Sequence, residues 1–342
     1  MKNVFIRTAA LMLATTFAAP AFASDTQVKG KIFYDFSQVN KTIAGTKTKT
    51  TGGTLSRTYL TVKHTLDDTW KVRLTLDTIY QAKGTPAAAG KSIAYVKYAN
   101  LTGSFMPEFN VKIGIIETAW IGHEDHLSGH RYLSKSFVDQ NKWDDSADSG
   151  IGAFGKVADG MLNYDINVVN GAGYKKTSPS NSQDINARVG LSVLDGLTID
   201  LGYRDGYRGT KTLIGGVNAP AKEAKSTLTQ VMVTYGQGHD FRVAAGYAQH
   251  KIAPTIGVST TDKGLNLWAW ANFTDQLGAF ANYEEIKYSG AGLSKQQLTT
   301  VSVDYKANKK VKLSLVATNI KNLGGTSTNK ESIVGLYSQF KF

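Results

Sequence analysis

The fold of this chain is decided by residues 60–77, which read LTVKHTLDDTWKVRLTLD. On both sides of the segment Asp67-Asp68-Thr69, apolar and polar residues alternate with a period of two. Successive side chains of a β-strand point to opposite faces, so each half should form a strand with one apolar and one polar face. The short polar segment between the halves is typical of a tight turn. This stretch therefore predicts an antiparallel hairpin.

The same alternation continues from this hairpin in both directions along the chain. Each run is about as long as the 9–11 residues that a tilted strand needs to cross a bilayer. Sixteen runs are predicted as strands: 27–38, 56–66, 70–79, 91–100, 108–117, 150–157, 160–169, 184–194, 197–206, 225–235, 240–250, 264–273, 277–288, 296–306, 310–319 and 332–342.

The connections between these runs alternate between short and long. The long connections are 39–55, 80–90, 118–149, 170–183, 207–224, 251–263, 289–295 and 320–331. All of them would lie at the same end of the sheet, an asymmetry typical of transmembrane β-barrels with short periplasmic turns and long external loops. The sequence thus predicts an all-β fold, an antiparallel transmembrane barrel of sixteen strands. A soluble β-sandwich or propeller is the alternative, but its exposed positions would carry more Lys and Glu.

Composition excludes several classes of site. The 342 residues contain no Cys, which removes disulfides, thiolate metal sites and thiol nucleophiles. Lys and Arg exceed Asp and Glu by 39 − 27 = +12, so an anionic partner is expected. Past Ser24, no stretch approaches the roughly 18 apolar residues that a membrane helix needs.

The first residues predict export from the cytoplasm. Lys2 and Arg7 form a positive region before the apolar run from Ala9 to Ala18. Ala21-Phe22-Ala23 then forms a small-x-small cleavage site. Residues 1–23 are therefore predicted to be a cleaved signal peptide, and residues 24–342 to be one barrel domain. Export also argues against a nucleic acid as the anionic partner.

Seven short stretches carry a family resemblance: GKIFYDF at 30–36, RTYLTVK at 57–63, AYVKY at 94–98, WIGHED at 120–125, SADSG at 146–150, VVNGAGY at 168–174 and SQFKF at 338–342. In these stretches the chain resembles the Gram-negative outer-membrane porins, in particular the phosphate-selective porins O and P. The resemblance implies a homotrimer of sixteen-stranded barrels in the outer membrane, surrounded by lipid and lipopolysaccharide. It also implies a long third loop folded into each pore.

The polar faces of the predicted strands would line this pore, and they are rich in cations. The predicted pore-lining basic residues are Arg57, Lys63, Lys71, Arg73, Lys97, Lys112, Arg188, Arg204 and Arg242. They are densest on the second to fifth strands, where the only acid expected on the polar face is Asp77. We expect a water-filled channel for passive diffusion that prefers small inorganic or organic anions. The alternative is that these cations only keep the lumen wet and pair with nearby acids.

This distribution departs from the phosphate-selective members of the family. Those proteins have a dense arginine ladder, whereas the arginines here are scattered and form no Arg-x-Arg-x-Arg run. The sequence therefore gives no reason to transfer phosphate specificity to this chain.

The connection 119–149 is far longer than usual, which predicts a functional role. Its candidate constriction residues are His123, Glu124, Asp125, His126, His130 and Arg131. We hypothesise that Glu124, Asp125 and Arg131 oppose the basic strands across the lumen. The order His-Glu-Asp-His differs from the helical H-E-x-x-H zinc motif, so no metal and no cofactor is predicted.

One other function remains open. The Thr-, Ser- and Lys-rich external loops could serve an outer-membrane receptor or adhesin. An enzyme is not predicted, because the chain has no G-x-S-x-G motif and shows no positioned Ser-His pair. Ion conductance by the purified protein would separate a pore from a receptor barrel.

Overall fold

The computed structural model describes residues 25–80, 92–175, 183–208, 224–254, 257–290, 293–324 and 327–342. The predicted signal peptide, residues 1–23, lies outside the described residues, as do parts of several predicted long loops. In the described ranges the chain consists of sixteen strands and two short helices.

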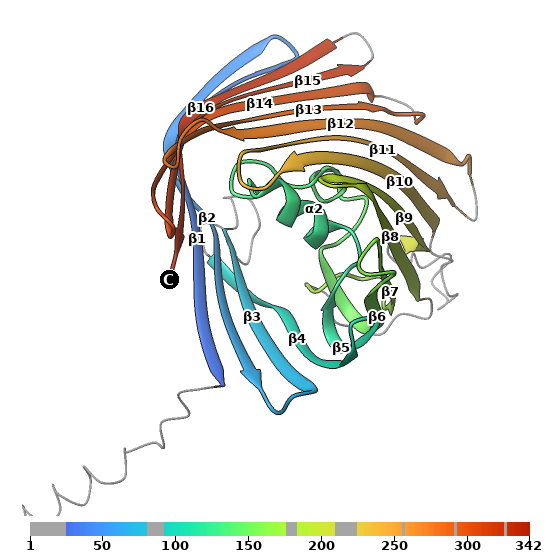
Figure 1. The fold of residues 1–342 in the computed structure, drawn as a ribbon. Coiled ribbons are helices and arrows are strands. Elements are labelled where there is room, and N and C mark those ends of the chain that lie inside the picture. The colour runs from blue at the N-terminus through green and yellow to red at the C-terminus, as the bar shows by residue number, and fades with distance from the viewer. Residues whose placement is uncertain are drawn as a thin grey trace, which may run out of the picture.

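The strands form one antiparallel sheet that closes on itself, as Figure 1 shows. Each strand pairs with its neighbours in sequence, and β1 pairs with β16. The strands are β1 (Thr26–Ile43), β2 (Thr46–Thr65), β3 (Trp70–Tyr80), β4 (Ser92–Met106), β5 (Phe109–Glu117), β6 (Ala147–Val157), β7 (Leu162–Val169), β8 (Asp184–Leu194), β9 (Leu197–Arg208), β10 (Ala224–Gln237), β11 (Phe241–Ala253), β12 (Thr260–Asn272), β13 (Leu277–Lys287), β14 (Leu293–Asn308), β15 (Val311–Gly324) and β16 (Ser327–Lys341).

The first and last strands close the barrel at their ends. The Gly30 amide donates to the Phe342 carbonyl at 2.9 Å, and the Phe342 amide donates to the Gly30 carbonyl at 3.1 Å. A closed sheet leaves no edge with unpaired backbone groups, which is the condition for crossing lipid with strands. The predicted sixteen-stranded antiparallel barrel is confirmed.

The two faces of the sheet follow the predicted alternation. On β14, Val303 is 60% exposed on the outside, while its neighbours Ser302 and Asp304 point inward and are 6% and 3% exposed. Large apolar side chains cover the outer surface, including Leu315, 67% exposed. This inversion of a soluble protein's polarity suits a barrel whose outside contacts acyl chains.

Two predicted long loops are in fact strand. Residues 39–55 lie mostly within β1 and β2, which meet in a two-residue turn at Ala44 and Gly45. Both turn residues have positive φ, 47° and 84°, as a tight hairpin turn requires. Most of residues 320–331 likewise belongs to β15 and β16. These segments contain few apolar residues, so alternation could not reveal them, although their backbone hydrogen bonds continue.

One short connection is shorter than the sequence predicts. The predicted strands 91–100 and 108–117 leave a link between them, but β4 continues to Met106 and the chain turns at Pro107 and Glu108 into β5. The end of β4 contains Thr and Ser and lacks a regular apolar alternation, so the sequence did not predict it as strand.

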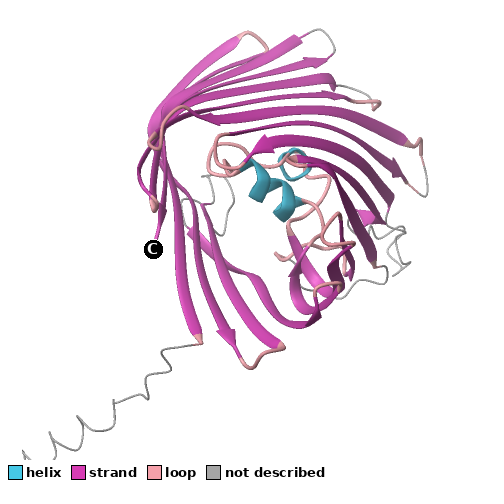
Figure 2. Ribbon diagram, viewed as in Figure 1, coloured by secondary structure: helices cyan, strands magenta, loops and turns pink. Residues whose placement is uncertain are grey.

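The long connection between β5 and β6 lies inside the barrel. It spans residues 118–146 and contains α2 (Ile121–Ser128) and α3 (Phe137–Gln140). Figures 1 and 2 show the helices within the ring of strands, so the long third loop does fold into the barrel. We call residues 118–146 the third loop. Neither described helix is long and apolar enough to cross a membrane.

Candidate functional site: the barrel interior

An apolar cluster fixes the third loop to one wall of the barrel. Its residues on the loop are Trp120, Ile121, Phe137, Val138 and Trp143. They pack against inward side chains of β10 to β13, namely Leu228, Met232, Ala244, Ala248, Trp268, Phe280 and Ile286. The inner face of these strands is therefore covered by the loop. The sequence held a signal for this patch, because Leu267-Trp268-Ala269-Trp270 is apolar on both faces.

Glu124 is part of this attachment. Its carboxylate accepts hydrogen bonds from Trp120 Nε1 at 2.9 Å and from Asn266 Nδ2 of β12 at 3.1 Å. The Phe137 amide donates to the same carboxylate at 3.4 Å. Glu124 is 4% exposed. It does not oppose the basic strands, contrary to the hypothesis drawn from the sequence, because the loop helix turns it toward the opposite wall.

Two of the three loop histidines also hold the loop to the wall. His123 Nε2 lies 3.0 Å from Asp200 Oδ2 of β9, and His130 Nε2 lies 2.8 Å from Asp304 Oδ2 of β14. The His130 ring stacks on Phe280 with 4.5 Å between ring centroids. His126 is exposed on α2. Among the described residues, no group of three His, Asp or Glu side chains could hold a metal ion.

Two arginines predicted to line the pore are buried in ion pairs instead. Arg204 is 1% exposed, and its guanidinium lies 3.1 Å from Asp184 and 3.8 Å from Asp144 of the third loop. Arg188 pairs with Asp200 at 2.8 Å and donates to the Ala119 carbonyl at 3.0 Å. Arg204 and Arg188 thus clamp the two ends of the third loop, and their charges are neutralised within the protein.

Across the barrel from the strands that the third loop covers, three more predicted cations form ion pairs with carboxylates of the same wall. The ion pairs are Arg57–Asp77 at 2.5 Å, Arg73–Glu117 at 2.7 Å and Lys112–Asp165 at 2.7 Å. The expectation that these cations face only Asp77 is therefore wrong. Glu117 ends β5, and Asp165 lies on β7, two strands away from Lys112 on β5.

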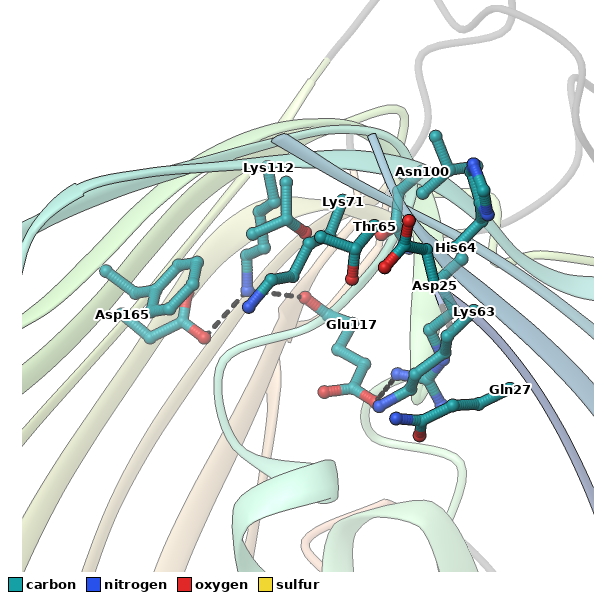
Figure 3. Close-up of a pocket in the computed structure, with 14 residues that line it drawn as sticks. Asp25, Gln27, Lys63, His64, Thr65, Lys71, Asn100, Lys112, Glu117 and Asp165 are labelled. Carbon is teal, nitrogen blue, oxygen red and sulfur yellow. Dashed lines mark hydrogen bonds and ion pairs between the residues drawn. The ribbon is translucent and has the colours of Figure 1, made fainter. Parts of the chain in front are cut away.

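A cavity of about 460 Å³ opens beside these pairs, at the short-turn end of the barrel. Figure 3 shows Lys112 between Asp165 and Glu117, with Lys63 and Lys71 nearby. Lys63 and Lys71 have no carboxylate within 4.0 Å in the part of the chain that the structure describes. We call Lys63 and Lys71 uncompensated because, among the described residues that line the cavity, they are the lysines without an ion pair.

Like charges face one another across neighbouring strands at this end. The directly opposite inward pairs are Lys63 with Arg73, Lys31 with Lys341, and Lys306 with Lys312. Such pairs destabilise a sheet, because the Cβ atoms of directly opposite residues lie only about 5 Å apart and the like charges repel. Together they extend the positive potential of the cavity along β14, β15, β16 and β1. Arg242 also points inward, on β11, and is half-buried.

Lys97 lies on β4 and points into the lumen toward the third loop. It is 6% exposed, and its ammonium lies 5.1 to 5.6 Å from the ring centroids of Tyr59, Tyr98 and Tyr174. Tyr174 follows β7 in a loop and was not among the predicted pore-lining residues, although it ends the family-like stretch 168–174. Its hydroxyl donates to Asp77 at 2.8 Å and accepts from Arg57 at 3.3 Å.

Asp125 and Arg131 of the third loop face this wall. Arg131 Nε lies 3.0 Å from Asp125 Oδ2, and Arg131 Nη2 lies 2.8 Å from Asp139 Oδ2. Asp125 and Arg131 interact electrostatically with Lys97. Of the three residues expected to oppose the basic strands, the structure thus brings two to them.

Glu124 should make the attachment of the third loop depend on pH. Burial raises the pKa of the Glu124 carboxyl to about 7, and the negative charge of Asp125 acts in the same direction. The hydrogen bond from Trp120 lowers the pKa but does not outweigh burial. The folded protein then holds a proton that the unfolded chain releases near pH 4.5, so stability falls as pH rises from about 4.5 to 7. Glu124→Gln should remove at most about 3 kcal/mol of this loss.

Denaturant unfolding between pH 5 and pH 8 measures this effect. Glu331→Gln is the matched control, since Glu331 forms a surface pair with Lys41 at 3.0 Å. An unchanged pH slope in the Glu124 variant, with the control behaving like the parent, would contradict the prediction.

The sequence profile of the Gram-negative porins matches residues 8–340. The chain belongs to the Gram-negative porin family. Its closed barrel and its family make it an outer-membrane channel protein. The comparison with curated proteins gave no match.

Solved porin structures share the fold at low sequence identity. An anion-selective porin from Comamonas acidovorans is similar with a TM-score of 0.67 and 15% identity, covering 93% of this chain and 99% of that chain. OprB of Pseudomonas putida has a TM-score of 0.66 and 10% identity, with 94% and 95% covered. The outer-membrane channel DcaP of Acinetobacter baumannii has a TM-score of 0.65 and 12% identity, with 93% and 97% covered.

Proposed function

We propose that this porin is a water-filled channel for passive diffusion of small hydrophilic solutes and that it prefers anions. One observation carries the preference: the third loop covers β10 to β13, so the open side of the lumen is the wall with the uncompensated Lys63 and Lys71. The fold similarity to a porin described as anion-selective supports the proposal.

The size of the effect suits conduction. A single charge about 4 Å from an ion contributes about 1 kcal/mol in water, which enriches an anion about fivefold. Conduction also requires binding at several weak sites rather than in one tight cage. Lysines distributed along the wall meet this requirement, whereas the ion-paired arginines do not attract solutes at full strength.

The resemblance to the phosphate-selective porins O and P raises the question of which anions the channel conducts. The cavity lysines could bind phosphate as well as chloride, but the arginines near them are paired with acids. We therefore propose small anions as the solute class, with phosphate as one of them. Single-channel recordings with chloride and phosphate test this point.

The oligomeric state and the orientation in the membrane are further parts of the proposal. We infer a homotrimer, since OmpT of Vibrio cholerae, described in a trimer form, shares the fold with a TM-score of 0.60 at 13% identity. The signal peptide would be cleaved before insertion, the short turns would face the periplasm, and the two-residue turn at 44–45 would face outward with the long loops. The protein would be a channel rather than an enzyme.

Planar-bilayer measurements in a KCl gradient test the function directly. The zero-current potential should indicate that chloride permeates better than potassium, by about fivefold if one uncompensated lysine dominates. A clear potassium preference would overturn the anion proposal while leaving a pore. Absence of conductance would instead favour the alternative, a receptor or adhesin that acts through its external loops.

A further inference from the structure

Another cavity lies between the third loop and a different part of the barrel wall. Its volume is about 360 Å³, within the range of roughly 300–1,000 Å³ that small-molecule sites occupy. Residues 131–135 of the third loop line one side, and inward residues of β14, β15, β16, β1 and β2 line the other. These five strands follow one another around the sheet, as Figure 1 shows. We call this space the wall cavity.

The barrel side of the wall cavity is apolar, although it belongs to the lumen. Leu298 of β14 lies directly opposite Ile320 of β15, and Ile333 of β16 is the diagonal neighbour of Ile320. Leu298 is 7% exposed, and both isoleucines are half-buried. We call these three residues the apolar wall. The inner face of a membrane barrel is ordinarily polar, so the apolar wall is suited to the apolar part of a solute rather than to water.

Lys135 of the third loop contributes a cation to the wall cavity. It is half-buried and has no carboxylate within 4.0 Å among the described residues. Burial lowers the pKa of its ammonium, and Arg131 and Arg57 act in the same direction against Asp139. Arg131 and Arg57 also line the cavity, but both are ion-paired with acids outside its lining. Lys135 is therefore the cation that the carboxylate of a solute would compensate.

Asp35 of β1 contributes the opposite charge. Its side chain points inward, is 9% exposed and accepts a hydrogen bond from Ser37 Oγ at 3.1 Å. No Lys, Arg or His nitrogen of the described ranges lies within 4.0 Å of its carboxylate. Among the described residues that line the wall cavity, Asp35 is the only acid. The unpaired charges of Lys135 and Asp35 cancel, so the wall cavity favours neither a free anion nor a free cation.

The loop side of the wall cavity is held in place by contacts with the barrel. The Tyr132 hydroxyl lies 2.6 Å from Ser314 Oγ of β15, and Asn282 Nδ2 of β13 donates to Ser134 Oγ at 3.1 Å. These contacts immediately precede Lys135 in the chain and fix its backbone relative to β1. A preorganised site of this kind loses less conformational entropy when it binds a solute.

We propose that the wall cavity binds zwitterionic amino acids with large apolar side chains, such as leucine or phenylalanine, as they cross the channel. The solute's carboxylate contacts Lys135, its ammonium contacts Asp35, and its side chain packs on the apolar wall. A zwitterion gains at both charges, whereas an anion loses at Asp35 what it gains at Lys135. A sugar would leave hydroxyl groups without hydrogen-bond partners against the apolar wall. This inference rests on the proposed channel function and deepens it by naming a solute class.

Block of the ion current by added solutes tests the proposal. L-phenylalanine and glycine carry the same charges at about pH 6, where both are zwitterions. The concentration that halves the single-channel current in KCl should be at least about tenfold lower for phenylalanine, because burial of a large apolar side chain strengthens binding by that factor or more. K135Q and D35N should each raise this concentration for phenylalanine by about fivefold, since each loses one charge contact. I320T/I333T should raise it for phenylalanine but not for glycine.

Matched controls separate the zwitterion from other solutes. Lys142 lies on the same loop, is exposed and does not line the wall cavity, so K142Q should be blocked like the parent. N-acetyl-L-phenylalanine keeps the apolar side chain and the carboxylate but lacks the ammonium. It should block the parent more weakly than phenylalanine does, and it should block D35N better than it blocks the parent.

Two results would overturn the proposal while leaving the channel function intact. The first is a conducting parent that phenylalanine and glycine block equally, a comparison that does not depend on the folding of any variant. The second is equal block of the parent by phenylalanine and N-acetyl-L-phenylalanine, because the wall cavity would then take organic anions. Absence of any conductance would overturn the channel function and this inference together.

Discussion

Replacing Lys63 and Lys71 with glutamate should convert the channel from anion-preferring to cation-preferring. Both side chains line the cavity and have no carboxylate within 4.0 Å among the described residues. Each replacement removes one positive charge and adds one negative charge, so an anion near either site loses about 2 kcal/mol in water. The zero-current potential in a KCl gradient should change sign.

A matched pair of lysines controls for net charge. Lys47→Glu/Lys49→Glu makes the same change on the outer face of β2, away from the lumen. This variant should keep the sign of the zero-current potential. K63Q/K71Q should fall between the parent and the glutamate variant. If the folded K63E/K71E protein still prefers anions, the cavity lysines do not set selectivity, and Lys97, on β4 beside the third loop, becomes the next cation to replace.

Replacing Arg204 with methionine should loosen the third loop and strongly destabilise the barrel. Arg204 is 1% exposed, pairs with Asp184 and Asp144, and donates to Ser226 Oγ at 2.8 Å. Removing one partner of a buried ion pair leaves carboxylates buried without their counter-charge, which lowers the free energy of unfolding by about 3–5 kcal/mol. Because Asp144 belongs to the loop, single-channel conductance should also rise. Denaturant unfolding and conductance measure the two effects.

Arg242→Met is the control for this variant. Arg242 points into the same lumen but is half-buried and forms no ion pair with another described residue. Its replacement should change the free energy of unfolding by less than about 1 kcal/mol. The double variant Arg204→Met/Asp184→Asn should recover part of the lost stability, since it removes a buried charge that lacks its partner. Equal stability of the Arg204 and Arg242 variants would show that the clamp does not hold the loop.

The sequence predicted the number of strands better than their lengths. Runs such as Trp70 to Asp77 alternate because one face contacts lipid, so these strands could be predicted from the sequence. Beyond Phe36, the hairpin of β1 and β2 continues to its turn with both faces in polar surroundings. The apolar periodicity ends there, although the strands continue.

The candidate site was predicted only in part. Inward direction followed from alternation, so Lys63, Lys71 and Arg204 were all placed in the lumen. Which of them is uncompensated depends on residues far away in sequence, such as Asp144 for Arg204, Glu117 for Arg73 and Asp165 for Lys112. No local pattern encodes these partners. Glu124 was misplaced for the same reason, because the docking of α2 on β12 decides its direction.

The amino-acid sequence alone determined the barrel, since the two-residue period of an extended backbone is a local property and sixteen amphipathic strands must pair all their backbone groups in lipid. The tertiary structure alone decided which lumen charges are neutralised and which wall the third loop covers. Those outcomes depend on the register between strands and on contacts made across the barrel, where electrostatic energy varies with distance and not with position along the chain.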